Sequence, residues 1–78
     1  MIQKVIQKSR KDLSIGDRVC AVKWRDGGKT VDILYQGKVV GLEHGEVQVS
    51  VEHVSRDGYK VGEVESELPG DLIPTQDA

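Results

Sequence analysis

The fold of this chain is decided by the stretch Tyr35-Gln36-Gly37-Lys38-Val39-Val40-Gly41. Every second residue of the stretch, starting at Tyr35, falls on one face, which carries an aromatic ring, a gap without a side chain and a β-branched residue. This period is typical of a β-strand that is covered on one side. A glycine inside a strand costs stability, so Gly37 indicates a bend or a place where another backbone or a ligand comes close. The stretch therefore predicts the central strand of a small, strongly curved β-barrel.

The length and composition set the class of protein. The chain has 78 residues, enough for one domain but not for a catalytic cleft between two. A core of this size rarely supplies more than about 3–5 kcal/mol, and such domains often add disulfides, metals or oligomerisation. Cys20 is the only cysteine, so a disulfide within the chain is excluded and a reducing compartment is expected. Self-association therefore stays open as a source of stability.

No hydrophobic segment points to a membrane or to secretion. The longest apolar runs fall far short of the roughly 18–20 residues needed to cross a bilayer, and the first residues lack the apolar core of a secretory signal. We expect a cytoplasmic protein that has no membrane partner.

The charges divide unevenly along the chain. The net charge is −2, but residues 1–30 hold eight Lys or Arg and three Asp, whereas residues 31–78 hold three Lys or Arg and ten Asp or Glu. In a small barrel the strands interleave, so this division fits an ordinary mixed surface. The alternative is a basic face that binds anions or nucleic acid.

The order of patterns divides the chain into an arm at residues 1–13, a barrel over residues 14–75 and a tail at residues 76–78. The arm places Ile2, Val5 and Ile6 at helical spacing among basic residues, and a short helix, an edge strand or a frayed tail would each fit. In the barrel the first four strands are predicted at Arg18–Trp24, from Val31 or Ile33 to Leu42, at Glu46–Val54 and at Tyr59–Val64.

The turns complete the predicted architecture. Asp57-Gly58 is the strongest hairpin signal and predicts a direct turn between the third and fourth strands. Glu65 to Gly70 is predicted to be a polar link, and Asp71 to Pro74 a short turn or 3-10 segment leading to a last edge strand closed by Pro74. Five short strands with glycine at most turns predict an all-β, five-stranded SH3-like barrel, with an OB-fold as the alternative.

Known catalytic and metal motifs are incomplete in this sequence. Gly28-Lys29-Thr30 is like the end of a phosphate-binding loop, but Lys23 stands where that motif needs its first glycine. Cys20, His44 and His53 are too few and too widely spaced for a zinc site. We therefore predict no metal site and no catalytic residues.

Three residue sets that resemble reactive groups have structural interpretations. Cys20 shares a strand face with Val22 and is expected to pack there rather than act as a nucleophile. His53 is expected to end the apolar row of the third strand. Glu63, Glu65 and Glu67 fall on one side of an extended chain and are predicted to form a solvated acidic edge.

The aromatic residues suggest the one candidate binding site. Trp24 and Tyr35 stand on either side of the loop Arg25–Thr30, where they either cap the core or line the mouth of the barrel. At the mouth they would hold a cationic group or stack on a base or a nicotinamide ring. The predicted ligand-binding residues are Trp24, Tyr35, Lys23, Arg25, Asp26, Lys29 and Asp32.

Two families share short patterns with the chain. Tudor-type barrels have an opening, a second strand and a closing turn that resemble Val19–Gly27, Tyr35–Val39 and Asp71–Pro74. Those modules bind methylated lysine or arginine in an aromatic cage. The resemblance implies that Trp24 and Tyr35 would belong to such a cage.

The second resemblance is to the plasmid-encoded type II dihydrofolate reductases. It rests, in order, on Gly16–Val19, Tyr35–Gly41, Asp57–Val61, Val64–Gly70 and Ile73-Pro74. It implies an SH3-like barrel that assembles as a homotetramer around one pore, where NADPH and dihydrofolate meet.

The residues that would line such a pore differ in this chain. Asp71-Leu72-Ile73 stands where the family has Val-Gln-Ile-Tyr, and Ala21 stands where it has a lysine. Only Ile73 of that set is kept, with Lys23 as a displaced substitute.

These patterns together predict a non-catalytic binding module that recognises a protein or another ligand through an aromatic and basic barrel mouth. One alternative is a reductase-like homo-oligomer that binds NADPH in a shared pore. The other is a nucleic-acid-binding barrel that uses the basic first thirty residues. No cofactor is expected outside the NADPH alternative.

Overall fold

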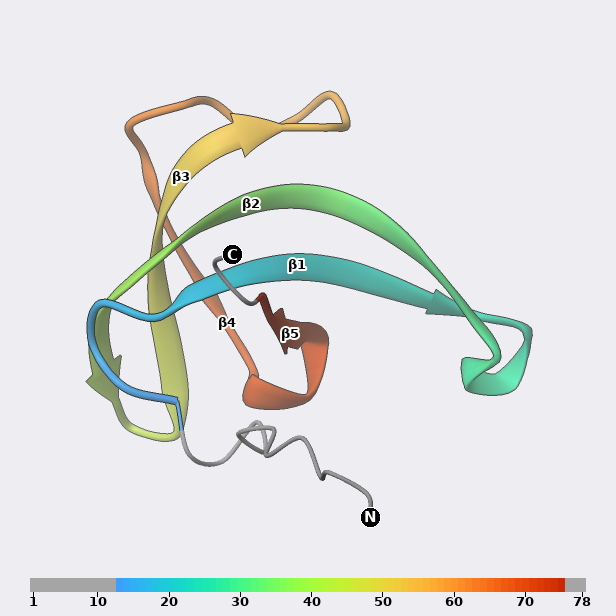
Figure 1. Ribbon diagram of the computed structural model, residues 1–78, viewed down its shortest axis with the longest axis horizontal. Helices are drawn as coiled ribbons and strands as arrows, with labels where there is room; N and C mark the ends of the chain where they lie inside the picture. Colours follow the sequence, from blue (N-terminus) through green and yellow to red (C-terminus); the bar gives the residue numbers. More distant parts are fainter. Residues whose placement is uncertain (1–12, 76–78) are drawn as a thin grey trace, which may run out of the picture.

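The computed structural model describes residues 13–75, which form one strongly curved sheet (Figure 1). The sheet has five antiparallel strands in the order β4-β3-β2-β1-β5. Their bounds are Arg18–Arg25 for β1, Thr30–Glu43 for β2, Glu46–Val54 for β3, Val64–Glu67 for β4 and Leu72–Pro74 for β5. Two 3-10 turns lie between strands, η2 at Asp26–Gly28 and η3 at Pro69–Asp71.

The predicted all-β class is confirmed, as is a 3-10 turn directly before the last strand. No pairing joins β4 to β5 within the described residues, so hydrogen bonds do not close the sheet into the predicted barrel. Residues 1–12 of the predicted arm and the tail at residues 76–78 lie outside the described part of the chain. Among residues 13–75, we find no helix with the length and hydropathy to span a membrane.

The central strand β2 has the faces that its sequence predicts. Tyr35 and Val39 are fully buried, Gly37 is buried between them, and Gln36 on the other face is exposed. A Cβ atom added to Gly37 would lie 2.2 Å from the backbone oxygen of Ser50. The predicted close approach of another backbone is therefore confirmed, and it comes from the neighbouring strand β3.

The core fills the concave side of the sheet. Valines at alternate positions of β3 point into it and are at most 2% exposed. The buried cluster consists of Leu13, Val19, Ala21, Tyr35, Val39, Val47, Val49, Val51 and Leu72. Fully burying each large apolar side chain contributes roughly 1.5–3 kcal/mol, so this cluster is the main source of stability.

One prediction for β3 is wrong. His53 does not end the apolar row but is exposed, whereas Val54 packs against the core. The cause is a β-bulge, because His53 pairs with Gln36 while Val51 pairs with Gly37, which leaves one extra residue on β3. A bulge of this kind reverses the face on which the following residues lie.

The predicted fourth strand at Tyr59–Val64 and the polar link at Glu65–Gly70 are also wrong, since β4 occupies Val64–Glu67. Asp57-Gly58 does form a turn, but a second turn at Val61-Gly62 follows before β4 begins. The backbone N–H of Gly62, where φ is +95°, donates to the oxygen of Val51 at 2.9 Å. The strand therefore starts after this second turn rather than after the first.

Candidate functional site

The outer part of the β1–β2 pair, residues 22–33, projects beyond the other strands, and we call it the projecting hairpin. It extends away from the rest of the sheet along the longest dimension of the molecule, 43 Å (Figure 1). Its base is a β-bulge: Ala21 pairs with Tyr35 but Val22 pairs with Ile33, which leaves Leu34 without a partner on β1. The carbonyl oxygen of Leu34 instead accepts hydrogen bonds from the backbone N–H groups of residues 55 and 56, at 3.0 and 3.1 Å.

The bulge decides which side chains the hairpin exposes. Without it, Ile33 would share the face of Tyr35 and point into the core. With it, Ile33 lies beside Val22, and Val31 lies beside Trp24, because directly paired residues share a face. We call these four residues the apolar ladder.

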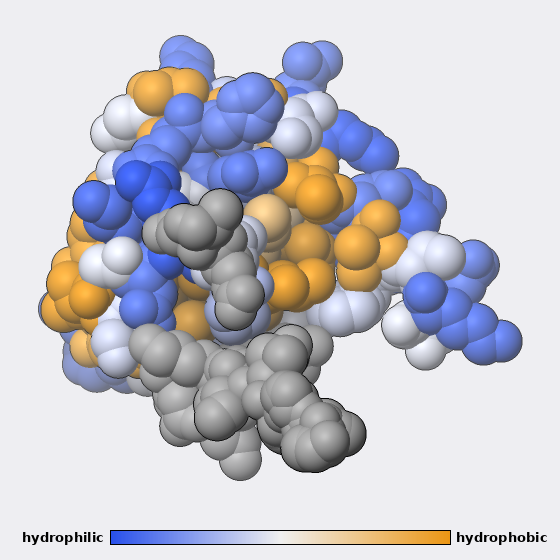
Figure 2. All heavy atoms as spheres, viewed as in Figure 1, coloured by the Kyte–Doolittle hydropathy of each residue, from blue (hydrophilic) through white to orange (hydrophobic). Residues whose placement is uncertain are grey.

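The apolar ladder lies on the outer side of the sheet. Val22 is buried, Trp24 and Val31 are half-buried, and Ile33 remains 40% exposed. Figure 2 shows apolar side chains gathered over the middle of β1 and β2. The ladder thus offers a small apolar surface outside the core cluster.

The opposite face of the projecting hairpin carries charged groups. Lys23 lies directly opposite Asp32 in the pairing of β1 with β2. The Arg25 side chain donates a hydrogen bond to the Asp32 carboxylate. Arg56, from the loop after β3, lies 3.1 Å from the same carboxylate. The hydrogen bond from Arg25, followed by the charges of both arginines, holds the pKa of Asp32 below its usual value. Asp32 therefore forms ion pairs with two arginines, Arg25 and Arg56.

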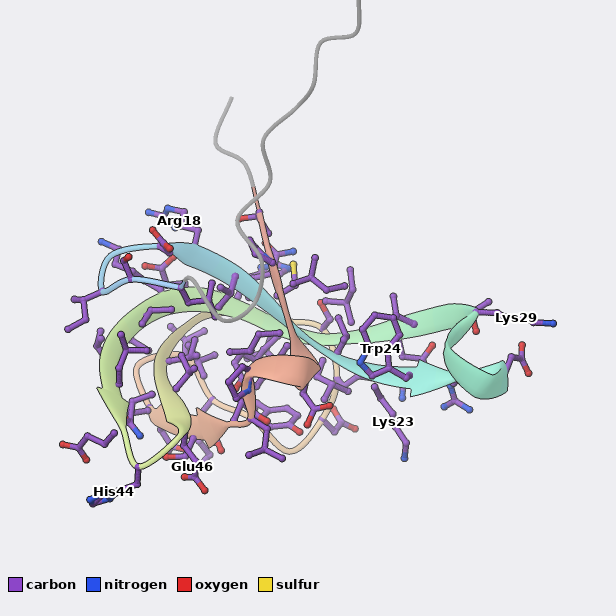
Figure 3. All side chains as sticks on the ribbon, turned by 90° about the horizontal axis from the view of Figure 1, so that it is seen from below. Arg18, Lys23, Trp24, Lys29, His44 and Glu46 are labelled. Carbon is purple, nitrogen blue, oxygen red and sulfur yellow. The ribbon has the colours of Figure 1, made fainter. Side chains whose placement is uncertain are left out.

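Two lysines of the projecting hairpin remain exposed. Within the described residues, neither Lys23 nor Lys29 makes an ion pair. Figure 3 shows both side chains reaching away from the hairpin, with Lys29 at its tip. Asp26 lies near Lys29 at the tip, as the first residue of η2, with a φ of +54°.

Trp24 joins the hairpin to the turn before the last strand. Its ring Nε1 donates a hydrogen bond to the carbonyl oxygen of Gly70 in η3 at 3.0 Å. A half-buried ring held in this way adds rigidity to the base of the hairpin while keeping part of its surface accessible.

Tyr35 lies apart from the other predicted site residues. It is fully buried, its ring centre lies 4.8 Å from that of Tyr59, and its hydroxyl donates to Glu67 Oε2 at 2.5 Å. The structure therefore brings together Trp24 and the predicted charged residues on the hairpin, and it places Tyr35 in the core.

The pKa values of Tyr35 and Glu67, which are in contact, are both raised in the folded protein. Burial, reinforced by the hydrogen bond to Glu67, raises the pKa of the Tyr35 hydroxyl far above its usual value. Burial also raises the pKa of Glu67, and the bond from Tyr35 partly opposes this. Glu65 and Glu67 are half-buried, so the predicted solvated acidic edge is only partly solvent-facing.

Sequence reasoning missed Val31 and Ile33 as surface residues of the site. The available signal was the alternation of Val31 and Ile33 with Asp32, which places the two apolar side chains on one face of the strand. Which side of the sheet that face takes depends on the bulge at Leu34, and no glycine or proline marks the bulge. It also missed Tyr59 as the ring that packs on Tyr35, because Tyr59 was assigned to a strand.

No group of three or more His, Cys, Asp or Glu residues within 13–75 is placed to hold a metal ion. Burial raises the pKa of the Cys20 thiol and so disfavours the reactive thiolate.

Comparison of the chain with protein-family models, with curated proteins and with solved structures finds no match.

Proposed function

We propose that the chain is a non-catalytic binding module of SH3-like type, and that the projecting hairpin is the surface that contacts a protein partner. The observation that carries the proposal is the combination, on one projecting element, of the partly exposed apolar ladder with Lys29 at the tip, which has no ion pair among residues 13–75. The 3-10 turn directly before the last strand supports the SH3-like assignment.

The proposal follows from the usual composition of protein interfaces. Their centres hold aromatic and aliphatic side chains, and their rims hold charged ones. On the projecting hairpin, Trp24 and Ile33 would form such a centre, with Lys29 at the rim, while Lys23 lies on the opposite face (Figure 3). A complementary partner segment carries Asp or Glu beside aliphatic or aromatic residues.

Tyr35 takes no part in this proposal because its ring is fully buried. An aromatic cage made by Trp24 and Tyr35, as the Tudor-type resemblance implies, would need the Tyr35 ring to be accessible. A protein segment laid along the apolar ladder needs only surface that the hairpin exposes. The geometry therefore favours a peptide-binding role over capture of a single cationic group.

The test uses an arrayed library of short synthetic peptides of varied charge and hydropathy. Peptides bound on the array are then titrated in solution against the fluorescence of Trp24, the only tryptophan. We expect the bound peptides to combine acidic and apolar residues. Ile33→Ser, and separately Lys29→Glu, should each weaken binding about tenfold, which corresponds to roughly 1.4 kcal/mol.

Matched control variants lie in the loop that precedes β4. Val61 is 65% exposed and Lys60 is exposed, so Val61→Ser and Lys60→Glu make the same chemical changes away from the hairpin. These variants should bind as the unchanged protein does. The proposal is wrong if they weaken binding as much as the hairpin variants, or if no peptide binds.

Two further titrations distinguish the alternatives. A response of Trp24 fluorescence to NADPH, from a tetramer, would support the reductase-like assembly. Binding of a short DNA or RNA duplex with an affinity that falls steeply with salt would support the nucleic-acid alternative.

A further inference from the structure

A second surface lies at the end of the sheet opposite the projecting hairpin. It is an open pocket of about 260 Å³ beside the β2–β3 turn. Its apolar lining comes from Leu13, Leu42, Val47 and Pro69. Leu42 is 46% exposed although its strand partner Val47 is buried, so the pocket leaves part of the core end uncovered.

The rim of this pocket carries a pair of like charges. Glu43 and Glu46 are directly opposite each other as the last pair of β2 and β3, and both are exposed. Like charges at directly opposite positions destabilise a strand pair. No cation among residues 13–75 forms an ion pair with either carboxylate. A cation from outside the described residues would relieve the repulsion between these two carboxylates.

The chain itself supplies a segment with matching chemistry. Leu13, the first residue that the structure describes, is part of the pocket wall, so residues 1–12 join the fold at this place. That segment carries apolar Ile2, Val5 and Ile6, and its cations outnumber its single acid, Asp12. Those cations are Lys4, Lys8, Arg10 and Lys11.

The segment is long enough to reach the pocket. Ile6 is seven residues before Leu13, and an extended chain spans roughly 3.3 Å per residue. The spacing of Ile2, Val5 and Ile6 places the three side chains on one side of a helical turn, which would let them enter an apolar recess together.

We propose that residues 2–8 of the same chain dock on this pocket, with Ile2, Val5 and Ile6 against Leu42 and Val47, and with Lys4 and Lys8 beside Glu43 and Glu46. Docking covers the exposed surface of Leu42 and neutralises the paired carboxylates at the rim. It leaves the hairpin free, because the β2–β3 turn, marked by His44 and Glu46, lies at the other end of the molecule from Lys29 (Figure 3). The inference is therefore independent of the proposed function.

The test is methyl and amide NMR on the full chain labelled with ¹³C and ¹⁵N. We expect nuclear Overhauser effects between the methyl groups of Ile2, Val5 or Ile6 and those of Leu42 or Val47. Their absence from the unchanged protein would overturn the proposal. Mixing labelled with unlabelled chains identifies the source, since contacts found only between chains would assign the pocket to a second copy and would equally overturn it.

Charge reversal tests the role of the rim. Glu43→Lys with Glu46→Lys should abolish the Overhauser effects, whereas Glu63→Lys, at an exposed position in the loop before β4, should leave them unchanged. The resonances of Val49 and Tyr35 report whether each variant keeps its core. Retention of the contacts after reversal of both rim charges, in a folded variant, would contradict the placement of the lysines.

Discussion

The two halves of β2 turn their alternate residues to opposite sides of the sheet. In the half from Tyr35 to Val39, alternate residues point into the core and are fully buried. In the half from Val31 to Ile33, residues of the same sequence parity lie on the outer face, beside Val22 and Trp24. The reversal takes place at one residue, Leu34, which has no partner on β1. A single bulge therefore divides the strand into a part that stabilises the fold and a part that presents a surface.

This difference separates stability from binding. The core half packs against β3 and contributes to the buried cluster, so changes there should be felt by the whole domain. The hairpin half has few buried neighbours and is held at its base by Leu34, by the arginines around Asp32 and by the bond from Trp24. Binding residues are often found on such projecting segments of a rigid scaffold.

The largest effect is expected at Gly37, in the core half. In Gly37→Ala the new Cβ would lie 2.2 Å from the Ser50 oxygen and 2.7 Å from Val49 Cγ1. Since a backbone atom is hard to displace, we expect a loss of about 3 kcal/mol or more in the free energy of unfolding. Urea denaturation followed by Trp24 fluorescence measures the loss.

Gly41 in the same strand is the matched control. A Cβ there would meet the side-chain oxygen of Gln48 at 2.8 Å, and a flexible side chain can move away. Gly41→Ala should therefore cost much less than Gly37→Ala. Equal losses for the two variants would show that the close approach of β3 to Gly37 is not what limits this strand.

The next effect concerns the buried hydroxyl of the core half. Tyr35→Phe removes the hydrogen bond to Glu67 and leaves a half-buried carboxylate without its donor. We expect a cost of about 1 kcal/mol at neutral pH, below the roughly 1.5–3 kcal/mol of bonds to charged groups, because solvent screens Glu67 in part.

The sign of the pH dependence follows from the raised pKa of Glu67. Between 4.5, its ordinary value, and the higher pKa of the folded protein, the native state binds more protons than the unfolded state. In that window stability falls as pH rises, and the burial penalty on Glu67 is fully present only above it. The cost of Tyr35→Phe should therefore be larger at neutral pH than below pH 4.5. Tyr59→Phe, which keeps the bond to Glu67, serves as the control, and a cost independent of pH would refute this account.

The sequence predicts the core half better than the hairpin half for a physical reason. Alternating valines in β3 and the period of Tyr35 to Val39 determine which residues are buried as long as the strands pair without interruption. The bulges at Leu34 and Glu52 interrupt that pairing, and neither is marked by glycine or proline. Each reverses the faces on one side of it, which is why His53 was assigned to the wrong side and the exposed position of Ile33 was not predicted.

The position of Tyr35 illustrates the same limit at the candidate site. The sequence predicts that Trp24 and Tyr35 stand on either side of one loop, and in the structure they do lie on either side of η2. The face of each ring, however, depends on the bulge between them and on contacts that are remote in sequence. Tyr35 binds Glu67, which is 32 residues away, and Trp24 binds Gly70, which is 46 residues away.

The smallest effect on stability is expected in the hairpin half, at the two lysines that have no ion pair within the described residues. Lys23→Gln with Lys29→Gln should change the free energy of unfolding by less than about 0.5 kcal/mol, as is usual for exposed positions, because neither change places a like charge opposite Asp32. Arg25→Gln is the contrasting variant, since it removes a donor from Asp32, and it should destabilise more than the lysine pair. Urea denaturation of the three proteins measures both changes. If neutralising the lysines destabilises as much as removing Arg25, the hairpin half contributes to folding as the core half does, and the division of β2 into two functions fails.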